Sequence, residues 1–243
     1  MIDQRSPSGS ANINRVFRCL LSVSAAAAIG LSQSACQPIR PSDRITVARA
    51  GRITSLDPAQ ASTFGAQQVI SALGDTLYTR SMSGELMPSL ASGPPEISDD
   101  GLTVTIPLRD DVLFHDGTPF NAEAMAFSLR RFLAIGTLSY VVGDRIKAVE
   151  TPSAFELRLR LNRPSSSLEN LLTSTNLTPV SPTAYHDHQD RFLNDNFVGT
   201  GPYRLASFQA VQQRLDPFEQ YWGQPPSNPG LNLIYLSNST ALF

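Results

Sequence analysis

Hydrophobic residues alternate with polar ones along two segments in the middle of the chain. Segment 102–108 (LTVTIPL) has an aliphatic residue at every second position, and segment 155–161 (FELRLRL) repeats the pattern. A period of two is typical of a half-buried β-strand, so both segments are predicted to be strands. Because Pro107 cannot donate a ladder hydrogen bond, the first strand is expected to lie at a sheet edge or to carry a bulge there.

A helical period appears in two other segments. In segment 64–78 (FGAQQVISALGDTLY) the apolar residues recur at a spacing near 3.6, and segment 122–133 repeats this spacing. Both segments are therefore predicted to be amphipathic helices. Asn121 stands where an N-cap belongs, and Glu123 in the first turn suits the helix dipole.

Shorter apolar runs complete the pattern. Segments 44–51 (RITVARAG) and 231–237 (LNLIYLS) predict short strands, and a further strand is predicted to begin at Tyr203, after the turn FVGTGP. The stretch GTGP lacks the Gly-Lys-Ser/Thr ending of a phosphate-binding loop and precedes a strand, so no nucleotide site is expected. Strands and helices that alternate in this way indicate a mixed α/β fold.

The N-terminal region carries an export signal. Two arginines precede an apolar run at residues 19–31, which is too short to span a bilayer as a helix. Residues 1–35 are therefore predicted to be a removable signal peptide, and residues 36–43 a tether. The stretch SQSAC resembles a bacterial lipobox, in which the cysteine, here Cys36, is lipidated. Gln33 replaces the usual aliphatic residue of that motif, so cleavage without lipidation remains the alternative.

The charge balance excludes a nucleic-acid partner. Without residues 1–35 the chain has 16 basic and 20 acidic side chains, a formal charge of −4, and Lys147 is its only lysine. No run of basic residues is available to neutralise phosphates. Of the two cysteines, Cys19 lies in the signal peptide, so no intrachain disulfide is expected.

Candidate catalytic groups are few. His115 and Asp116 are adjacent, as an acid–base pair would be, but side chains at a strand-to-helix corner tend to point apart, and Asp116 is expected to satisfy backbone groups of the turn. His186 and His188 would face one side of a strand and could bind a metal. An exported metal-dependent hydrolase is therefore an alternative function.

The sequence lacks the partners that such enzymes need. No glutamate stands at zincin spacing, no third metal ligand is identifiable, and no serine lies in a Gly-x-Ser-x-Gly elbow. The chain is therefore expected not to be an enzyme, and to hold no metal or cofactor.

Four ordered motifs carry a resemblance to a known family. They are GRITSLDPAQAS at residue 51, SLASGPPEISDDGLTVTIPLRDDVLFHDGTPFNAEAMAFSLRRF at residue 89, FVGTGPYRLASF at residue 197 and FEQYWGQPP at residue 218. Together they closely resemble family 5 extracellular solute-binding proteins, the peptide-, dipeptide- and nickel-binding components of ABC importers. The residues that carry this signature are expected to be structural: Arg109, Phe114, His115, Asp116, Gly117, Gly199, Gly201, Pro202, Tyr203, Tyr221 and Trp222.

The resemblance implies a fold and a division of the chain. The fold would be a periplasmic-binding-protein-like lobe of class II, cluster C type, with a mixed β-sheet and flanking helices. Residues 44–243 would form its N-terminal portion, with a main lobe at 44–65 and 176–243 and an inserted subdomain at 66–175. Members of the family are longer, so a second lobe is expected to be largely missing, either because the chain is a fragment or because the gene is truncated.

The resemblance also implies a function. The protein would be exported, either to the periplasm or as a lipoprotein on the outer face of the cytoplasmic membrane. There it would capture peptides or similar small solutes in a cleft between lobes and deliver them to an ABC permease with its ATPase. A peptide would lie extended and pair with a strand edge. The ligand-lining residues of the present lobe would be Gly51, Arg52, Ile53, Thr54, Thr63, Phe64 and Tyr140. A non-functional or structural lipoprotein remnant is a further alternative.

Overall fold

The computed structural model describes residues 44–49, 52–53, 55–141, 144–188, 193 and 195–236. All of these residues belong to one compact unit, Asp43–Phe243. Cys36, Gly51 and Thr54 therefore lie outside the described residues, as does the predicted signal peptide. Among the helices described, none is both long and apolar enough to cross a membrane.

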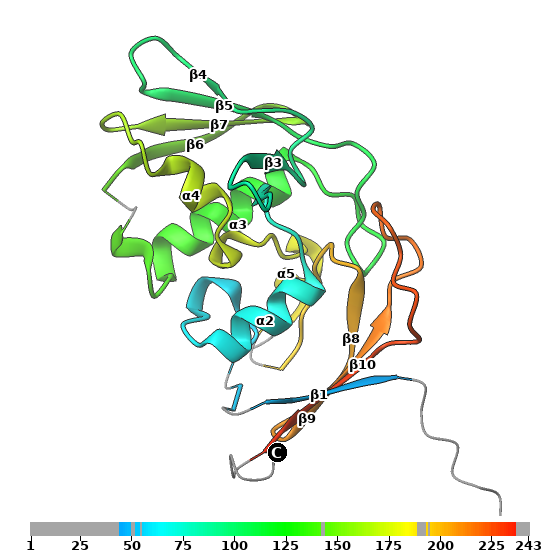
Figure 1. Ribbon diagram of the computed structural model, residues 1–243. Helices are drawn as coiled ribbons and strands as arrows, with labels where there is room; N and C mark the ends of the chain where they lie inside the picture. Colours follow the sequence, from blue (N-terminus) through cyan, green and yellow to red (C-terminus); the bar gives the residue numbers. More distant parts are fainter. Residues whose placement is uncertain are drawn as a thin grey trace, which may run out of the picture. The chain divides into compact units, whose positions relative to one another are not determined.

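One antiparallel sheet occupies the middle of the sequence. Its strand order is β4 (Glu96–Ile97), β5 (Thr103–Pro107), β7 (Glu156–Leu161) and β6 (Ile146–Ser153). The alternating apolar residues that predicted β5 and β7 are paired across the sheet, for example Val104 with Leu159. Helix α3 (Ala122–Ile135) packs against β6 and β7 (Figure 1). Asn121 caps this helix by accepting a hydrogen bond from the Ala124 N–H at 2.9 Å, which confirms the predicted cap.

The prediction for Pro107 was wrong. Strand β5 lies inside the sheet, between β4 and β7, and its pairing with β7 runs without a bulge. Pro107 is tolerated because it is the last residue of β5, beyond the two-residue strand β4. There its carbonyl accepts a hydrogen bond from the Ser92 N–H at 2.9 Å, and no ladder partner requires the missing N–H.

The core of this part of the chain is one large hydrophobic cluster. It includes the apolar faces of α3, β5 and β7, and also Leu77 and Leu177. A two-stranded hairpin, β2 (Tyr78–Arg80) with β3 (Leu86–Pro88), and helix α4 (Leu168–Leu172) belong to the same region. Two short 3-10 helices, η2 (Ser139–Val141) and η3 (Thr175–Leu177), follow α3 and α4.

A second sheet joins the two ends of the described chain. Its order is β1 (Ile45–Arg49), β10 (Leu231–Tyr235), β9 (Gln212–Pro217) and β8 (Tyr203–Gln209). Strands β1 and β10 are parallel, and the other neighbours are antiparallel, so the sheet is mixed. Three predicted strands are thereby confirmed. A second hydrophobic cluster lies against this sheet and contains residues of α2 (Phe64–Leu73).

Helix α2 is shorter than the periodicity predicts. It ends at Leu73, because Gly74 adopts an extended backbone at the C-cap and the chain then turns into β2. Leu77 follows the helical spacing but belongs to the first cluster, whereas Leu73 belongs to the second. The apolar residues of segment 64–78 thus serve two cores, which periodicity alone does not separate.

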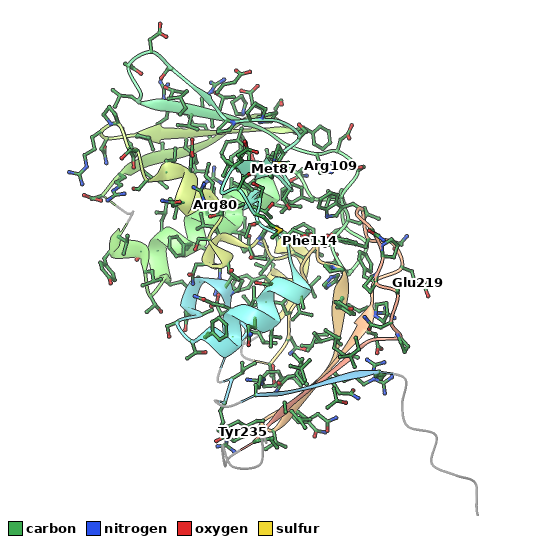
Figure 2. The ribbon with its side chains drawn as sticks, viewed as in Figure 1. Arg80, Met87, Arg109, Phe114, Glu219 and Tyr235 are labelled. Carbon is green, nitrogen blue, oxygen red and sulfur yellow. The ribbon has the colours of Figure 1, made fainter. Side chains whose placement is uncertain are left out.

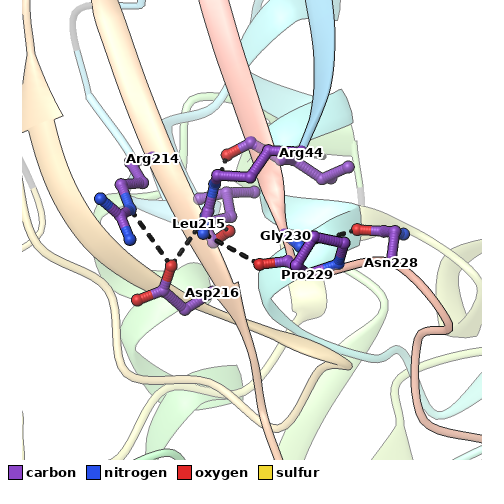
Figure 3. A network of polar contacts seen from close by, with 8 residues as sticks. Arg44, Arg214, Leu215, Asp216, Asn228, Pro229 and Gly230 are labelled. Atoms are coloured by element: carbon purple, nitrogen blue, oxygen red, sulfur yellow. Dashed lines mark hydrogen bonds and ion pairs between the residues drawn. The ribbon is translucent and has the colours of Figure 1, made fainter. Parts of the chain in front are cut away.

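The start of β1 is held by Arg44. Its guanidinium donates to the Pro229 carbonyl at 2.9 Å and lies 2.7 Å from an Asp216 carboxylate oxygen (Figure 3). Partial burial acts to raise the pKa of Asp216, but hydrogen bonds from Arg44 and Arg214 outweigh it and hold that pKa below its usual value. Gly230 has φ +127° and lies against Arg44, so the turn before β10 requires glycine.

Candidate functional site

The short 3-10 helix η1 (Pro58–Gln60) is held by a buried ion pair. Asp57 caps it by accepting a hydrogen bond from the Ala59 N–H at 3.0 Å. The same carboxylate binds Arg131 of α3 through two hydrogen bonds of 2.6 and 2.5 Å, and the two side chains are 4% and 9% exposed. Such a bidentate pair fixes position and orientation together, so η1 cannot shift independently of α3.

Two further residues hold η1 through hydrogen bonds. The Asn176 side-chain amide of η3 donates to the carbonyls of Pro58 and Ala61, at 2.7 and 2.9 Å. The Thr137 N–H, directly after α3, donates to the Ala59 carbonyl at 3.0 Å. Two segments far from η1 in the sequence, residues 131–137 and η3, therefore converge on it.

Large apolar side chains are exposed around this fixed helix. Phe64, at the first position of α2, is 75% exposed, Tyr140 of η2 is 77% exposed, and its neighbour Val141 is 45% exposed. Thr63 caps α2 by accepting a hydrogen bond from the Ala66 N–H at 3.3 Å. The η1 face is defined by these residues together: Asp57–Gln60, Thr63, Phe64, Tyr140 and Val141. Exposed aromatic side chains on a rigid base are typical of a binding surface.

Of the remaining predicted ligand-lining residues, the structure describes Arg52 and Ile53, which follow β1. Arg52 is exposed, and its guanidinium carbon lies 5.8 Å from the ring centre of Tyr235, the last residue of β10 (Figure 2). Ile53 is only 4% exposed and packs in the second cluster. Thr63 and Phe64 thus lie at the start of α2, Tyr140 lies in η2, and Arg52 lies beside the end of β10.

His115 joins the turn before α3 to the turn before β8. The Gly199 N–H donates to its Nδ1 at 3.3 Å, so Nδ1 is the acceptor and Nε2 carries the proton, which it donates to the Gly201 carbonyl at 3.0 Å. Burial lowers the pKa of His115 to about 4. The imidazole is therefore neutral near pH 7 and acts as a structural link.

The side chain of Asp116 has different partners. It accepts hydrogen bonds from the Thr118 N–H at 3.0 Å and from the Ser181 hydroxyl at 2.5 Å. Gly117 has φ +80°, which the tight turn requires. Phe114 is fully buried and packs edge-on against Phe120, with ring centres 6.1 Å apart (Figure 2). His115 and Asp116 share no hydrogen bond, so the structure offers no acid–base pair here.

The Tyr-Trp motif binds the half-buried carboxylate of Asp75. Asp75 accepts hydrogen bonds from the Tyr221 hydroxyl at 3.1 Å, from the Trp222 indole N–H at 3.0 Å and from the Thr200 hydroxyl at 3.0 Å. Burial raises the pKa of Asp75, and these three donors offset part of that rise. Arg109 lies over the Trp222 ring at 4.4 Å from its centre. These contacts tie the segments before β2 and before β8 to the segment after β9.

Other signature residues have backbone or hydroxyl partners. The Pro202 carbonyl accepts a hydrogen bond from the Phe218 N–H at 2.9 Å, and the Tyr203 hydroxyl accepts one from the Asn228 amide at 2.6 Å. A methyl group on Gly199 would lie 2.5 Å from the Leu73 carbonyl oxygen, so the backbone at the end of α2 packs directly on this glycine. These residues therefore fix the turn that precedes β8.

Metal-binding groups do not gather in the described part of the chain. No three His, Cys, Asp or Glu side chains there stand close enough to share a metal ion. His186 is exposed near the end of α5 (Pro182–His188), with its ring 5.2 Å from that of Phe127. The side chain of His188 lies outside the described residues.

Sequence reasoning missed the residues that hold the η1 face. Asp57 and Asn176 lie in polar segments without periodicity, and Arg131 is one of several arginines in the chain. The only local signal is the Asp-Pro pair at positions 57 and 58, which is typical of a capped helix start. Nothing in the sequence pairs these side chains across intervals of more than seventy residues.

Comparison with known proteins places the chain in a family. A family model described as bacterial extracellular solute-binding proteins, family 5 middle, matches residues 85–243. The glutathione-binding protein GsiB of Salmonella typhi is 31% identical over 202 residues, which are 82% of this chain and 39% of that protein. The GsiB protein of Shigella flexneri is 30% identical over 193 residues, which are 78% of this chain and 37% of the relative. The chain thus spans less than half the length of these relatives.

Solved structures share the fold. Listeria monocytogenes OppA bound to peptide has a TM-score of 0.76 at 19% identity, with 83% of this chain and 44% of that one covered. NikZ from Campylobacter jejuni in complex with Ni(L-His) has a TM-score of 0.74 at 24% identity, with 84% and 41% covered. The predicted mixed α/β, periplasmic-binding-protein-like fold is confirmed. The chain belongs to the family 5 bacterial extracellular solute-binding proteins.

Proposed function

We propose that this protein is the solute-binding component of an ABC importer for peptides or similar small solutes, and that the η1 face is this lobe's share of the ligand cleft. The ligand would lie extended against the face and would be covered by a second lobe before delivery to a permease with its ATPase. Family membership supports the general role. The relatives are named for binding glutathione, peptide or Ni(L-His), which supports a small solute as the ligand.

One observation carries the location of the cleft. Two aromatic side chains, Phe64 and Tyr140, are more than 70% exposed, although the segments that bear them are anchored to a buried ion pair. Exposed apolar area of this size is unfavourable in water, and a rigid base reduces the entropy lost when a ligand covers it. Ligand contacts of Arg52, Gly51 and Thr54 stay predictions.

The two hydrophobic clusters suggest how the lobe is divided. Residues of α2 pack with residues 180–233, whereas residues 77–177 form most of the first cluster. We therefore propose that the inserted subdomain begins after Gly74 rather than at residue 66, and that it ends near Thr178. The η1 face would then lie where this subdomain meets the main lobe.

Export and anchoring are part of the same proposal. The apolar run at residues 19–31 and Cys36 support a lipoprotein signal, which would hold the protein on the outer face of the cytoplasmic membrane. Replacing Cys36 with Ser would then release the protein from washed membranes. Unchanged membrane retention of that variant would exclude the lipid anchor and leave simple cleavage.

Calorimetric titration with short peptides tests the function. The titrated protein is the full-length protein, meaning the chain together with the proposed second lobe. We expect binding by the wild type, and a loss of at least tenfold in affinity when Phe64 and Tyr140 are both replaced by Ala, because buried aromatic anchors dominate such contacts. Phe155→Ala is the matched control, since Phe155 is also an exposed aromatic, at 41%, but lies between β6 and β7. Its affinity should equal that of the wild type.

The outcomes separate the alternatives. No peptide binding by the full-length wild type would overturn the proposed ligand class. Metal-dependent hydrolysis that is lost when His186 and His188 are replaced by Ala would establish the hydrolase instead. A chain of residues 36–243 that folds but binds nothing, beside a full-length protein that binds, would support the need for a second lobe.

A further inference from the structure

A hollow of about 230 Å³ opens beside η2, next to the η1 face. Its walls are the side chains of Phe132, Leu138, Val141 and Leu171, with Arg145 and Asn176 also among the lining residues. Val141 is shared with the η1 face, and Asn176 is the residue that binds the η1 carbonyls. A ligand that covered Tyr140 would therefore lie at the entrance of this hollow.

The walls suit an aliphatic side chain. Leu138 and Leu171 are half-buried against the first cluster, and Val141 remains 45% exposed, so the hollow presents apolar surface to water. Asn176 offers the hollow little hydrogen-bonding capacity, because its amide N–H groups already donate to Pro58 and Ala61. Burial of an aliphatic group here would remove apolar area of both partners from water.

Arg145 adds a positive charge to the same hollow. Its guanidinium donates to the Ser167 hydroxyl, which is a neutral partner. Within the described part of the chain Arg145 makes no ion pair, whereas Arg163 is paired with Asp144. An arginine with free N–H groups beside an apolar wall is suited to a carboxylate, which it binds through charge-assisted hydrogen bonds.

We infer that the hollow receives the last residue of a short peptide whose C-terminal side chain is aliphatic. The side chain enters between Leu138, Val141 and Leu171, and the terminal carboxylate binds Arg145. This inference rests on the proposed function and names the ligand class that this site selects. It also explains why the apolar walls and Arg145, which makes no ion pair within the described part of the chain, occur together in one hollow.

Titration of the full-length protein with three tripeptides tests the inference. Ala-Ala-Leu should bind at least tenfold more tightly than Ala-Ala-Ala, because a larger apolar group is buried. Ala-Ala-Leu amide, which lacks the carboxylate, should bind about tenfold more weakly than the free acid. Arg145→Gln should remove the difference between acid and amide, while Arg163→Gln, which lies outside the hollow, should preserve it.

A second variant tests the hollow by size. Leu171→Phe should fill it and weaken Ala-Ala-Leu about tenfold while leaving Ala-Ala-Ala unchanged. Equal affinities for the three peptides, or an acid–amide difference that persists in Arg145→Gln, would overturn the inference and leave the proposed function intact. If none of the peptides bound the wild type, the proposed function would fall as well.

Discussion

At the scale of single residues, His115 makes folding sensitive to pH. Burial lowers its pKa to about 4 in the folded protein, against an ordinary value of about 6.5 in an unfolded chain. Between pH 4 and 6.5 the unfolded state therefore binds more protons than the folded state. The contribution of the neutral His115 to the free energy of unfolding is complete above pH 6.5 and is lost as the pH falls toward 4. The loss from this group is on the order of 3 kcal/mol.

Urea unfolding at a series of pH values measures this effect. His115→Gln removes the titrating group, so its free energy of unfolding should decline less steeply between pH 6.5 and 4.5 than that of the wild type. Carboxylates such as Asp216 titrate in both proteins and cancel in the comparison. Identical slopes for the two proteins would show that His115 does not titrate abnormally.

The ion pair between Asp57 and Arg131 illustrates a different kind of residue effect. Asp57→Ala would leave the Arg131 guanidinium buried without its carboxylate and the Ala59 N–H without its cap. We expect the free energy of unfolding to fall by about 3–5 kcal/mol, measured by urea denaturation. Asp111→Ala is the control, because the pair that it breaks with Arg109 is 31% and 54% exposed and is expected to contribute about 1 kcal/mol or less.

A comparable loss in both variants would mean that burial does not decide the strength of these pairs. The more informative result would be a selective loss in Asp57→Ala together with weaker peptide binding by the full-length protein. That combination would connect the buried pair, which fixes η1, with binding by the exposed aromatics of α2 and η2.

At the scale of elements, the end of α2 and the turn before β8 fit backbone to backbone. A methyl group on Gly201 would lie 2.5 Å from the Leu73 carbonyl carbon and 2.9 Å from the Ala72 oxygen. Because backbone atoms cannot rotate away, Gly201→Ala should lower the free energy of unfolding by about 1–3 kcal/mol. In Gly93→Ala the nearest atom is Pro107 Cγ at 3.4 Å, so this control should stay within about 0.5 kcal/mol of the wild type.

The elements also show how far sequence patterns reach. β5, β7 and α3 were predictable because each buries one face, so its period is visible in the apolar residues. β9 (Gln212–Pro217) buries Gln213 and Leu215, and this polar residue hides the alternation. β6 contains Lys147 and Pro152 and bulges against β7, so its period is broken as well. A strand that is stabilised mainly by pairing with its neighbours need not show alternating apolar residues, so periodicity does not predict it.

The candidate site follows the same rule. Phe64 and Tyr140 were predicted through the family resemblance, and the structure exposes both. Their anchoring through Asn176 and the hollow with Arg145 depend on contacts across many residues of sequence. Such contacts are set by topology, which local periodicity does not encode.

At the scale of the molecule, polar contacts join the two hydrophobic clusters. Between them lie the hydrogen bonds of His115 with Gly199 and Gly201, and the bond from the Val180 N–H to the Ser128 hydroxyl at 3.0 Å. The Asp75 carboxylate, which holds Trp222, belongs to the same boundary. Since breaking these partly or fully buried bonds would leave polar groups unpaired, separation of the clusters is unfavourable.

We therefore expect the purified chain to unfold in one cooperative transition. Trp222 is the only tryptophan and reports on the boundary between the clusters, while far-ultraviolet circular dichroism reports on all helices and strands. Thermal transitions followed by the two signals should coincide, because loss of the boundary removes support from both cores. A tryptophan transition that precedes the loss of secondary structure would instead show that the clusters separate first. The two clusters would then be separate folding units, and the polar contacts between them would not make unfolding cooperative.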